Sequence, residues 1–277
     1  MKWTGTSVSL WSKVFKRKGN DEPPAAFGLE GARAYAIGDI HGRLDLLNNL
    51  LDRIEQDIRA REPRRNVIVF LGDYVDRGPE SAGVIERLRT FRPEHAEAVF
   101  LAGNHEEFFL RILHGDTHSL AQWLKFGGAE CVESYGIEVP QLLRLPRSEA
   151  LRLLQASVPA AHVEFLYGLE DSYGFGQYLF VHAGIRPGIA LEEQKRSDLR
   201  WIRDPFLSFD GSHGCVVVHG HTIVEEVQER RNRIGIDTGA YRSGLLTAVA
   251  IEDDRRWYLA GQLSGAEAIP AADPPAH

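Results

Sequence analysis

The stretch at residues 72–78 reads GDYVDRG. It directly follows residues 67–71 (VIVFL), an apolar run with the length and composition of a buried strand. Asp73 therefore stands where a strand ends, and Asp76 and Arg77 follow on the same loop. One loop thus offers a metal-binding carboxylate, a second acid and an arginine for phosphate. The ordinary alternative is a surface turn with an Asp–Arg ion pair.

Two more strand ends carry polar residues of the same kind. Residues 34–37 run into GDIHG at residues 38–42, and residues 99–101 run into GNHE at residues 103–106. The segments between the strands, residues 44–58 and 80–88, repeat apolar residues at helical spacing. Alternating strands and helices predict an α/β sheet whose site lies beyond the carboxyl ends of its strands. The side chains that we expect to meet there are Asp39, His41, Asp73, Asn104 and His105.

Histidines end two later apolar runs. Residues 181–184 read VHAG and residues 218–222 read VHGHT, which places His182, His219 and His221 after further strands. Spacing alone does not decide between His219 and His221. A single Asp-x-His pair is an ordinary loop feature, but clustered carboxylates repel one another unless a cation balances them. Carboxylate, amide and imidazole donors without a thiolate favour Mn, Fe, Zn or Mg over a structural zinc site.

The rest of the chain outlines the domain. Residues 106–170 are rich in leucine, contain three prolines and predict a helical region beside the site. Residues 1–25 form an N-terminal extension that we expect to be flexible, residues 26–263 the domain, and residues 264–277 a loose tail. The basic, partly apolar N-terminal segment has two interpretations, an element that touches a membrane or a partner, and a plain terminus. A second, more antiparallel sheet is predicted from the apolar runs at residues 178–181, 215–218, 234–236, 245–251 and 257–260.

Composition narrows the class of protein. The 277 residues are 43% hydrophobic and 26% charged, as in a globular domain with a full core. The formal net charge of −7 argues against a nucleic-acid partner, because nucleic-acid-binding surfaces cluster lysine and arginine. Only Cys131 and Cys215 occur, no stretch is apolar enough for a bilayer span, and the N-terminus lacks a secretory signal pattern. We therefore expect a cytoplasmic protein.

The motifs GDIHG, GDYVDRG, GNHE, VHAG and HGHT, in this order, resemble those of the phosphoprotein phosphatases. The likeness is to the compact bacterial and phage serine/threonine phosphatases of the calcineurin-like metallophosphoesterase superfamily, and it runs from about residue 34 to residue 250. It implies an α/β fold, a four-layer α/β/β/α sandwich with a helical insertion at residues 111–160. It also implies two divalent metal ions, Mn first with Fe, Zn or Mg as alternatives, and a bridging hydroxide as the nucleophile.

The resemblance assigns each site residue a role. Asp39 and His41 bind the first metal, Asp73 bridges both metals, and Asn104, His182 and His221 bind the second. His219 occupies a position that is not a ligand in such relatives.

The remaining roles concern acid catalysis and phosphate binding. By the same resemblance, His105 is the general acid that protonates the leaving alkoxide, and Asp76 orients its imidazole. Arg77 binds the phosphate with its planar guanidinium, and Arg203 is a second phosphate-binding arginine, although Arg200 stands nearby.

Three candidate functions are compatible with the sequence. The first is removal of phosphate from a protein serine or threonine, with tyrosine as a variant. Other small phosphate substrates stay open beside the second function. The second is hydrolysis of a dinucleoside polyphosphate of the diadenosine tetraphosphate kind, which cuts an anhydride and needs no strong general acid. Such relatives usually vary the residue before Arg77, so the intact Asp76 favours the protein phosphatase. The third is a non-catalytic relative that binds a partner through the same fold.

Overall fold

Two five-stranded sheets face each other in the computed structural model, which describes residues 26–262. The predicted extension at residues 1–25 and the predicted tail at residues 264–277 lie outside the described residues. Among the described residues, no helix is both long enough and apolar enough to cross a bilayer.

The first sheet has the strand order β10-β9-β1-β2-β3. Its strands β1, β2 and β3 are parallel, as the three predicted strand ends require, while β9 runs antiparallel to β1. The helices predicted between the strands are present, and both expose polar residues on one face. The elements are β1 (Ala32–Ile37), α1 (Leu44–Ala60), β2 (Arg65–Phe70), α2 (Ser81–Arg89), β3 (Ala96–Phe100), β9 (Leu245–Glu252) and β10 (Arg255–Gln262).

The second sheet has the strand order β4-β5-β6-β8-β7. The prediction was wrong about its membership, because the runs at residues 245–251 and 257–260 form β9 and β10 of the first sheet. It was also wrong about its direction at the centre, where β5, β6 and β8 are parallel and only the outer pairs are antiparallel. An apolar run marks a strand but does not identify its partner. The strands are β4 (Ser172–Phe175), β5 (Tyr178–Val181), β6 (Val216–His219), β7 (Gln228–Glu229) and β8 (Arg233–Gly235).

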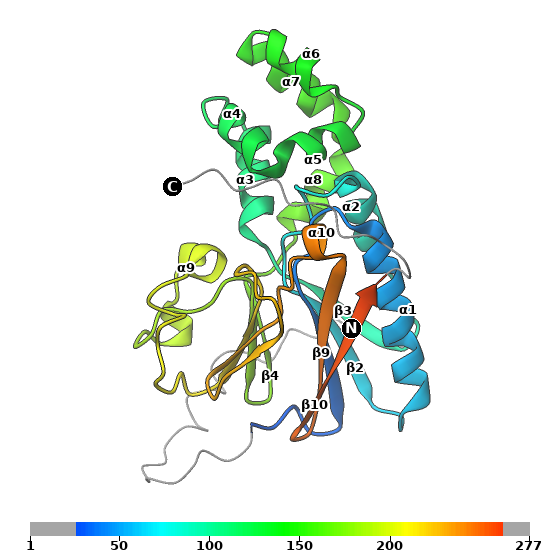
Figure 1. The fold of residues 1–277 in the computed structure, drawn as a ribbon, viewed down its shortest axis with the longest axis vertical. Coiled ribbons are helices and arrows are strands. Elements are labelled where there is room, and N and C mark those ends of the chain that lie inside the picture. The colour runs from blue at the N-terminus through cyan, green and yellow to red at the C-terminus, as the bar shows by residue number, and fades with distance from the viewer. Residues whose placement is uncertain (1–25, 263–277) are drawn as a thin grey trace.

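Side-chain alternation along β1 explains the layers. Ala34 and Ala36 face the second sheet, whereas Tyr35 and Ile37 face the helices. One core therefore lies between the sheets and another between the first sheet and the helix layer that includes α1 and α2. The outer face of the second sheet is covered by a thinner layer, η3 (Leu191–Glu193) and α9 (Arg196–Trp201), seen at the lower left of Figure 1. This arrangement is the predicted α/β/β/α order.

The predicted helical region projects from one end of the sandwich, with α6 and α7 farthest out (Figure 1). Its helices pack on the same core as α1 and α2, so it is an extension of that helix layer. It comprises α3 (Asn104–Leu113), α4 (Leu120–Trp123), η2 (Leu124–Gly128), α5 (Ala129–Ser134), α6 (Val139–Arg144), α7 (Arg147–Ser157) and α8 (Ala160–Tyr167).

Candidate active site

The side chains predicted as metal ligands converge at one edge of the sandwich. Asp39, Asp73 and Asn104 follow β1, β2 and β3 of the first sheet, while His182 and His221 follow β5 and β6 of the second. Carboxyl ends of parallel strands meet at the same edge, and facing sheets bring two such edges together. All of these side chains are buried, and so is His41.

Asp73 lies at the centre of the cluster. It belongs to two groups of donor atoms, one with His41 and His105 and one with His182 and His221, and within each group the atoms lie within 4.8 Å of one another. Asp73 Oδ2 is 3.5 Å from His41 Nε2, and Asp73 Oδ1 is 3.4 Å from His182 Nε2. One carboxylate therefore offers an oxygen to each side.

The donor set fits a cation. The Nδ1–H of His182 donates to the carbonyl of Leu71 at 2.9 Å, which leaves Nε2 without a proton. That nitrogen lies 2.9 Å from Asn104 Oδ1, and His221 Nδ1 lies 2.9 Å from the same oxygen. Two groups with lone pairs face each other at contact distance, an arrangement that a shared cation stabilises. The Nδ1–H of His41 likewise donates to the carbonyl of Val75 at 2.9 Å and so turns Nε2 toward Asp73.

Electrostatics prepares the ligands and the acid differently. Burial lowers the pKa of His41, of His182 and of His221, the last to about 2, so these imidazoles are neutral and ready to bind a metal. Burial by itself also lowers the pKa of His105, but the carboxylates of Asp73 and Asp76 outweigh it and hold that pKa above its ordinary value. The pKa of His105 is thus shifted in the opposite direction to those of His41, His182 and His221.

The loops that carry the cluster are strained. Five non-glycine residues of the site adopt positive φ, between 45° and 72°. Close approach between loops requires glycines here, because a Cβ at Gly103 would lie 2.1 Å from Asp73 Oδ1 and one at Gly220 would lie 2.0 Å from Asp39 Oδ1. The strained residues are His41, Asp73, Asp76, Arg77 and His221.

His105 and Asp76 form a hydrogen-bonded pair beside the cluster. The Nδ1–H of His105 donates to Asp76 Oδ2 at 2.6 Å, while Nε2 of the same ring faces Asp73 Oδ2 at 3.9 Å. Asp76 is completely buried. The arrangement fixes the ring so that Nε2 points toward the cluster, where a proton donor to a leaving group has to be.

The predicted arginines lie in different settings. Arg77 Nη1 donates to His41 Nε2 at 2.9 Å, which puts its guanidinium at the cluster. Arg203 is exposed, and its charge contributes, after burial and His182, to lowering the pKa of His221. Arg200 is held by Asp171, at 2.6 and 2.9 Å, and by Glu107 at 3.1 Å. Arg200 is therefore bound to carboxylates, whereas the side chain of Arg203 is not.

His219 points away from the cluster. Its Nδ1–H donates to the carbonyl of Gly220 at 3.0 Å, and its ring meets Phe206 edge-on at 5.1 Å. It belongs to neither group of donor atoms. The structure therefore distinguishes His219 from His221, which spacing could not do.

Four residues of the site were missed by the sequence reasoning. Glu106 accepts four backbone N–H groups, those of Gly103, Asp73, Tyr74 and Val75, at 2.7–3.2 Å and ties two loops together. Its place in GNHE was the signal available for it. The other three come from distant segments that no motif connects to the site, namely Trp123, Asp237 and Tyr241.

These distant residues contact the predicted ones directly. Trp123 Nε1 donates to Asp76 Oδ2 at 2.9 Å. Burial and the charges of Asp237 and Asp73 raise the pKa of Asp39. Tyr241 meets the ring of His41 edge-on at 5.5 Å, with the Arg77 guanidinium 5.0 Å from the tyrosine ring centre. Each of them borders a residue that the sequence did single out.

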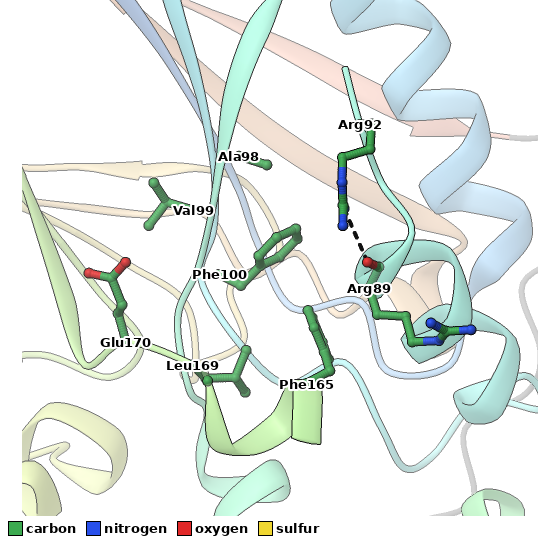
Figure 2. Close-up of a pocket in the computed structure, with 9 residues that line it drawn as sticks. Arg89, Arg92, Ala98, Val99, Phe100, Phe165, Leu169 and Glu170 are labelled. Atoms are coloured by element: carbon green, nitrogen blue, oxygen red, sulfur yellow. Dashed lines mark hydrogen bonds between the residues drawn. The ribbon is translucent and has the colours of Figure 1, made fainter. Parts of the chain in front are cut away.

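A cavity of about 280 Å³ lies elsewhere, along the edge strand β3 and the end of α8. Figure 2 shows Phe100 and Phe165 in its wall and Arg92 bonded to the backbone of Arg89. Both arginines are engaged, since Arg89 also pairs with Glu86. No residue of the metal cluster lines this cavity, so the reactive groups lie outside it.

Comparison with known proteins agrees with this geometry. Curated relatives include an asymmetrical bis(5'-nucleosyl)-tetraphosphatase PrpE of Anoxybacillus flavithermus, 28% identical, with 77% of this chain and 88% of that protein covered. Another is serine/threonine-protein phosphatase 1 of Salmonella typhimurium, also 28% identical, with 79% and 91% covered. Among solved structures, a cold-active protein-tyrosine phosphatase of a psychrophilic Shewanella species matches with a TM-score of 0.51, 18% identity, and 86% of this chain and 82% of that chain covered.

The family model described as calcineurin-like phosphoesterase matches residues 32–238, most of the described chain and all of the predicted site residues. The resemblance deduced from the motifs is thereby confirmed. The chain belongs to the calcineurin-like phosphoesterases and is a metal-dependent hydrolase.

Proposed function

We propose that this hydrolase is a serine/threonine protein phosphatase, with tyrosine as a further substrate, that cleaves phosphoric monoesters at a centre of two divalent cations. The observation that carries the proposal is the 2.6 Å hydrogen bond between His105 and Asp76, beside the donor atoms gathered around Asp73. An alkoxide is a poor leaving group, so its departure needs a positioned acid. A buried His–Asp pair supplies that acid.

The ligands divide around Asp73. Asp39 and His41 would hold the first cation, Asn104, His182 and His221 the second, and Asp73 both, with Mn first and Fe, Zn or Mg as alternatives. When bound, the cations supply Lewis acidity toward the phosphate and lower the pKa of the attacking water. The residues of the chain do the rest. Buried neutral imidazoles would supply their lone pairs, and the carboxylate of Asp73 lies between His41 and His182.

Arg77 and Arg203 would bind the phosphate. The guanidinium of Arg77 already lies against His41, and its planar shape suits two phosphate oxygens. His105 would then transfer a proton from Nε2 to the leaving oxygen, while Asp76 stabilises the imidazolium through Nδ1–H. In this proposal the attacking group is water, and no side chain acts as a nucleophile.

A second candidate, dinucleoside polyphosphate hydrolysis, is favoured by one observation. Several of the curated relatives carry the name bis(5'-nucleosyl)-tetraphosphatase, both asymmetrical and symmetrical. A nucleotide is a better leaving group than an alkoxide, so this activity would depend little on His105. The two functions therefore differ in how much they need the acid.

The compartment we propose is the cytoplasm. Both cysteines, Cys131 and Cys215, are free and buried, which suits a reducing environment. The N-terminal segment considered for membrane or partner contact lies outside the described residues.

The deciding experiment uses His105→Asn with His95→Asn as a matched control, since His95 is half-exposed and lies in a separate group with Glu55 and Glu94. Metal-stripped protein is reloaded with Mn, Zn, Fe or Mg and assayed on a phosphoserine peptide, an aryl phosphate and diadenosine tetraphosphate. We expect His105→Asn to lose about 100-fold in kcat on the phosphopeptide and far less on the aryl phosphate. Turnover of the dinucleotide alone, insensitive to His105→Asn, would instead establish the second candidate.

A further inference from the structure

The carboxylate of Asp76 receives two hydrogen bonds on one oxygen. Oδ2 accepts from His105 Nδ1 at 2.6 Å and from Trp123 Nε1 at 2.9 Å, whereas Oδ1 is buried without a hydrogen-bond partner. Trp123 and Asp76 are 47 residues apart in the chain. The indole therefore reaches the acid pair from the helical region rather than from the motif loops.

We propose that Trp123 is a positioning residue of the reaction, acting through Asp76 on His105. This inference rests on the proposed function, because it concerns the acid of that reaction. The indole N–H shares Asp76 Oδ2 with His105, so it restricts the rotation of the carboxyl group. A carboxylate held in one rotation in turn holds the imidazole with Nδ1 toward it and Nε2 toward the substrate.

The surroundings of Trp123 suit this role. Its side chain has no exposed surface and stacks on Phe109, with ring centres 5.4 Å apart and an interplanar angle of 16°. Gly128 also lies close, since a Cβ there would be 2.4 Å from the indole. A buried ring packed against these neighbours has little freedom to turn, so the direction of its N–H is set before substrate arrives.

The hydrogen bond also answers an energetic need. A buried carboxylate with few donors is costly to keep ionised, and a hydrogen bond to a charged group is stronger than one between neutral groups. His105 and Trp123 donate N–H groups to Asp76, and the Cys131 thiol is a further, weaker donor beside it. Removing the indole N–H would leave His105 and that thiol as donors and would loosen the rotation of the carboxylate.

The chain offers a matched control. Trp257 Nε1 donates to Asp57 Oδ2 at 3.1 Å, another indole–carboxylate bond, located on β10 and α1. Trp257→Phe thus removes the same kind of bond outside the site.

The test compares Trp123→Phe with Trp257→Phe in the metal-loaded full chain. We expect kcat on a phosphoserine peptide to fall about tenfold, a fraction of the 10²–10⁴ attributed to general acids, and kcat on 4-nitrophenyl phosphate to change less than about twofold. KM should stay constant for both substrates. Trp257→Phe should change neither rate.

A second readout needs no activity. The proton between His105 and Asp76 should give a downfield ¹H resonance, identified by its loss in His105→Asn, and Trp123→Phe should shift it while Trp257→Phe should not. If the phosphopeptide is no substrate, this shift still reports the contact, so failure of the proposed function is distinguishable. Should Trp123→Phe not fold, benzothienylalanine at residue 123 removes the N–H at similar volume. Equal losses on both substrates, or an unshifted resonance, would overturn the inference.

Discussion

His219 ends β6 and His221 follows two residues later on the loop, yet their imidazoles meet different surroundings. His221 turns Nδ1 toward Asn104, whereas His219 packs against Phe206 and leaves its Nε2 buried without a partner. Burial, only partly offset by the bond to Gly220, lowers the pKa of His219 to about 4. The residue is thus a neutral core histidine that should lower the free energy of unfolding at acidic pH.

The corresponding prediction concerns stability in metal-free protein. An unfolded histidine titrates near pH 6.5, so between about pH 6.5 and pH 4 the unfolded chain binds a proton that folded His219 does not, and stability falls as pH falls. His219→Asn keeps an N–H that can donate to the carbonyl of Gly220, and it removes the titrating group and with it this pH dependence of stability. We expect denaturant titrations at pH 7 and pH 5 to show the natural chain losing about 2 kcal/mol more than the variant.

Metal content provides the control for that variant. His219→Asn should bind as much metal as the natural chain, because His219 is in neither group of donor atoms. Parallel stability profiles, or a loss of metal in His219→Asn, would contradict this account of the residue.

The segment α4–η2 shows how an element outside the motifs shapes the site. Besides Trp123, it brings the carbonyl of Gly127 to the N–H of Arg77 at 2.8 Å. Gly127 has a φ of 105°, and a Cβ there would lie 2.5 Å from Arg77 Cγ. The helical region therefore supports both Asp76 and Arg77, the two strained residues of the DRG motif.

Gly127→Ala tests that support. The added methyl group collides with the Arg77 side chain, so we expect the inhibition constant of inorganic phosphate and the KM of the phosphopeptide to rise about tenfold, roughly one charge-assisted hydrogen bond. Gly115→Ala is the matched control, since Gly115 has a φ of 106° but only an ordinary contact at 3.9 Å. Both variants should lose about 1–3 kcal/mol of stability from backbone strain. An equal change of KM in both would attribute the effect to strain alone.

The sequence predicted the helices and strands better than it predicted which strands pair with one another. The three strand ends of the first sheet, α1 and the helical region could be predicted because period and turn residues are local signals. The placement of β9 and β10 could not, since pairing of β9 with β1 joins residues more than 200 positions apart. The role of Trp123 could not be predicted for the same reason, because its contact with Asp76 joins distant parts of the sequence. Its pattern is that of a core aromatic, and only the fold shows the N–H reaching Asp76.

In the whole molecule, the candidate centre joins the two sheets. Asp39, Asp73 and Asn104 come from the first sheet, and His182 and His221 from the second. Burial and the neighbouring carboxylates raise the pKa of Asp39, and burial raises that of Asp237 to about 6, whereas the surrounding histidines lower the pKa of Asp73. A cation bound among these side chains should therefore stabilise the edge where the two sheets meet, and metal affinity should contribute to the free energy of folding.

Chelation should accordingly destabilise the entire domain. A ligand that binds only the folded state at a thousandfold excess over its Kd contributes about 4 kcal/mol, which corresponds to roughly 10 °C in Tm for a chain of this length. We expect calorimetry with Mn and with EDTA to differ by about that amount. In Asp73→Asn the difference should nearly vanish, because Asp73 is the only residue common to both groups of donor atoms in the cluster. Glu55→Gln, in the exposed Glu55–Glu94–His95 group, should retain the full difference, and a Tm independent of metal in the natural chain would show that the sheets close without it.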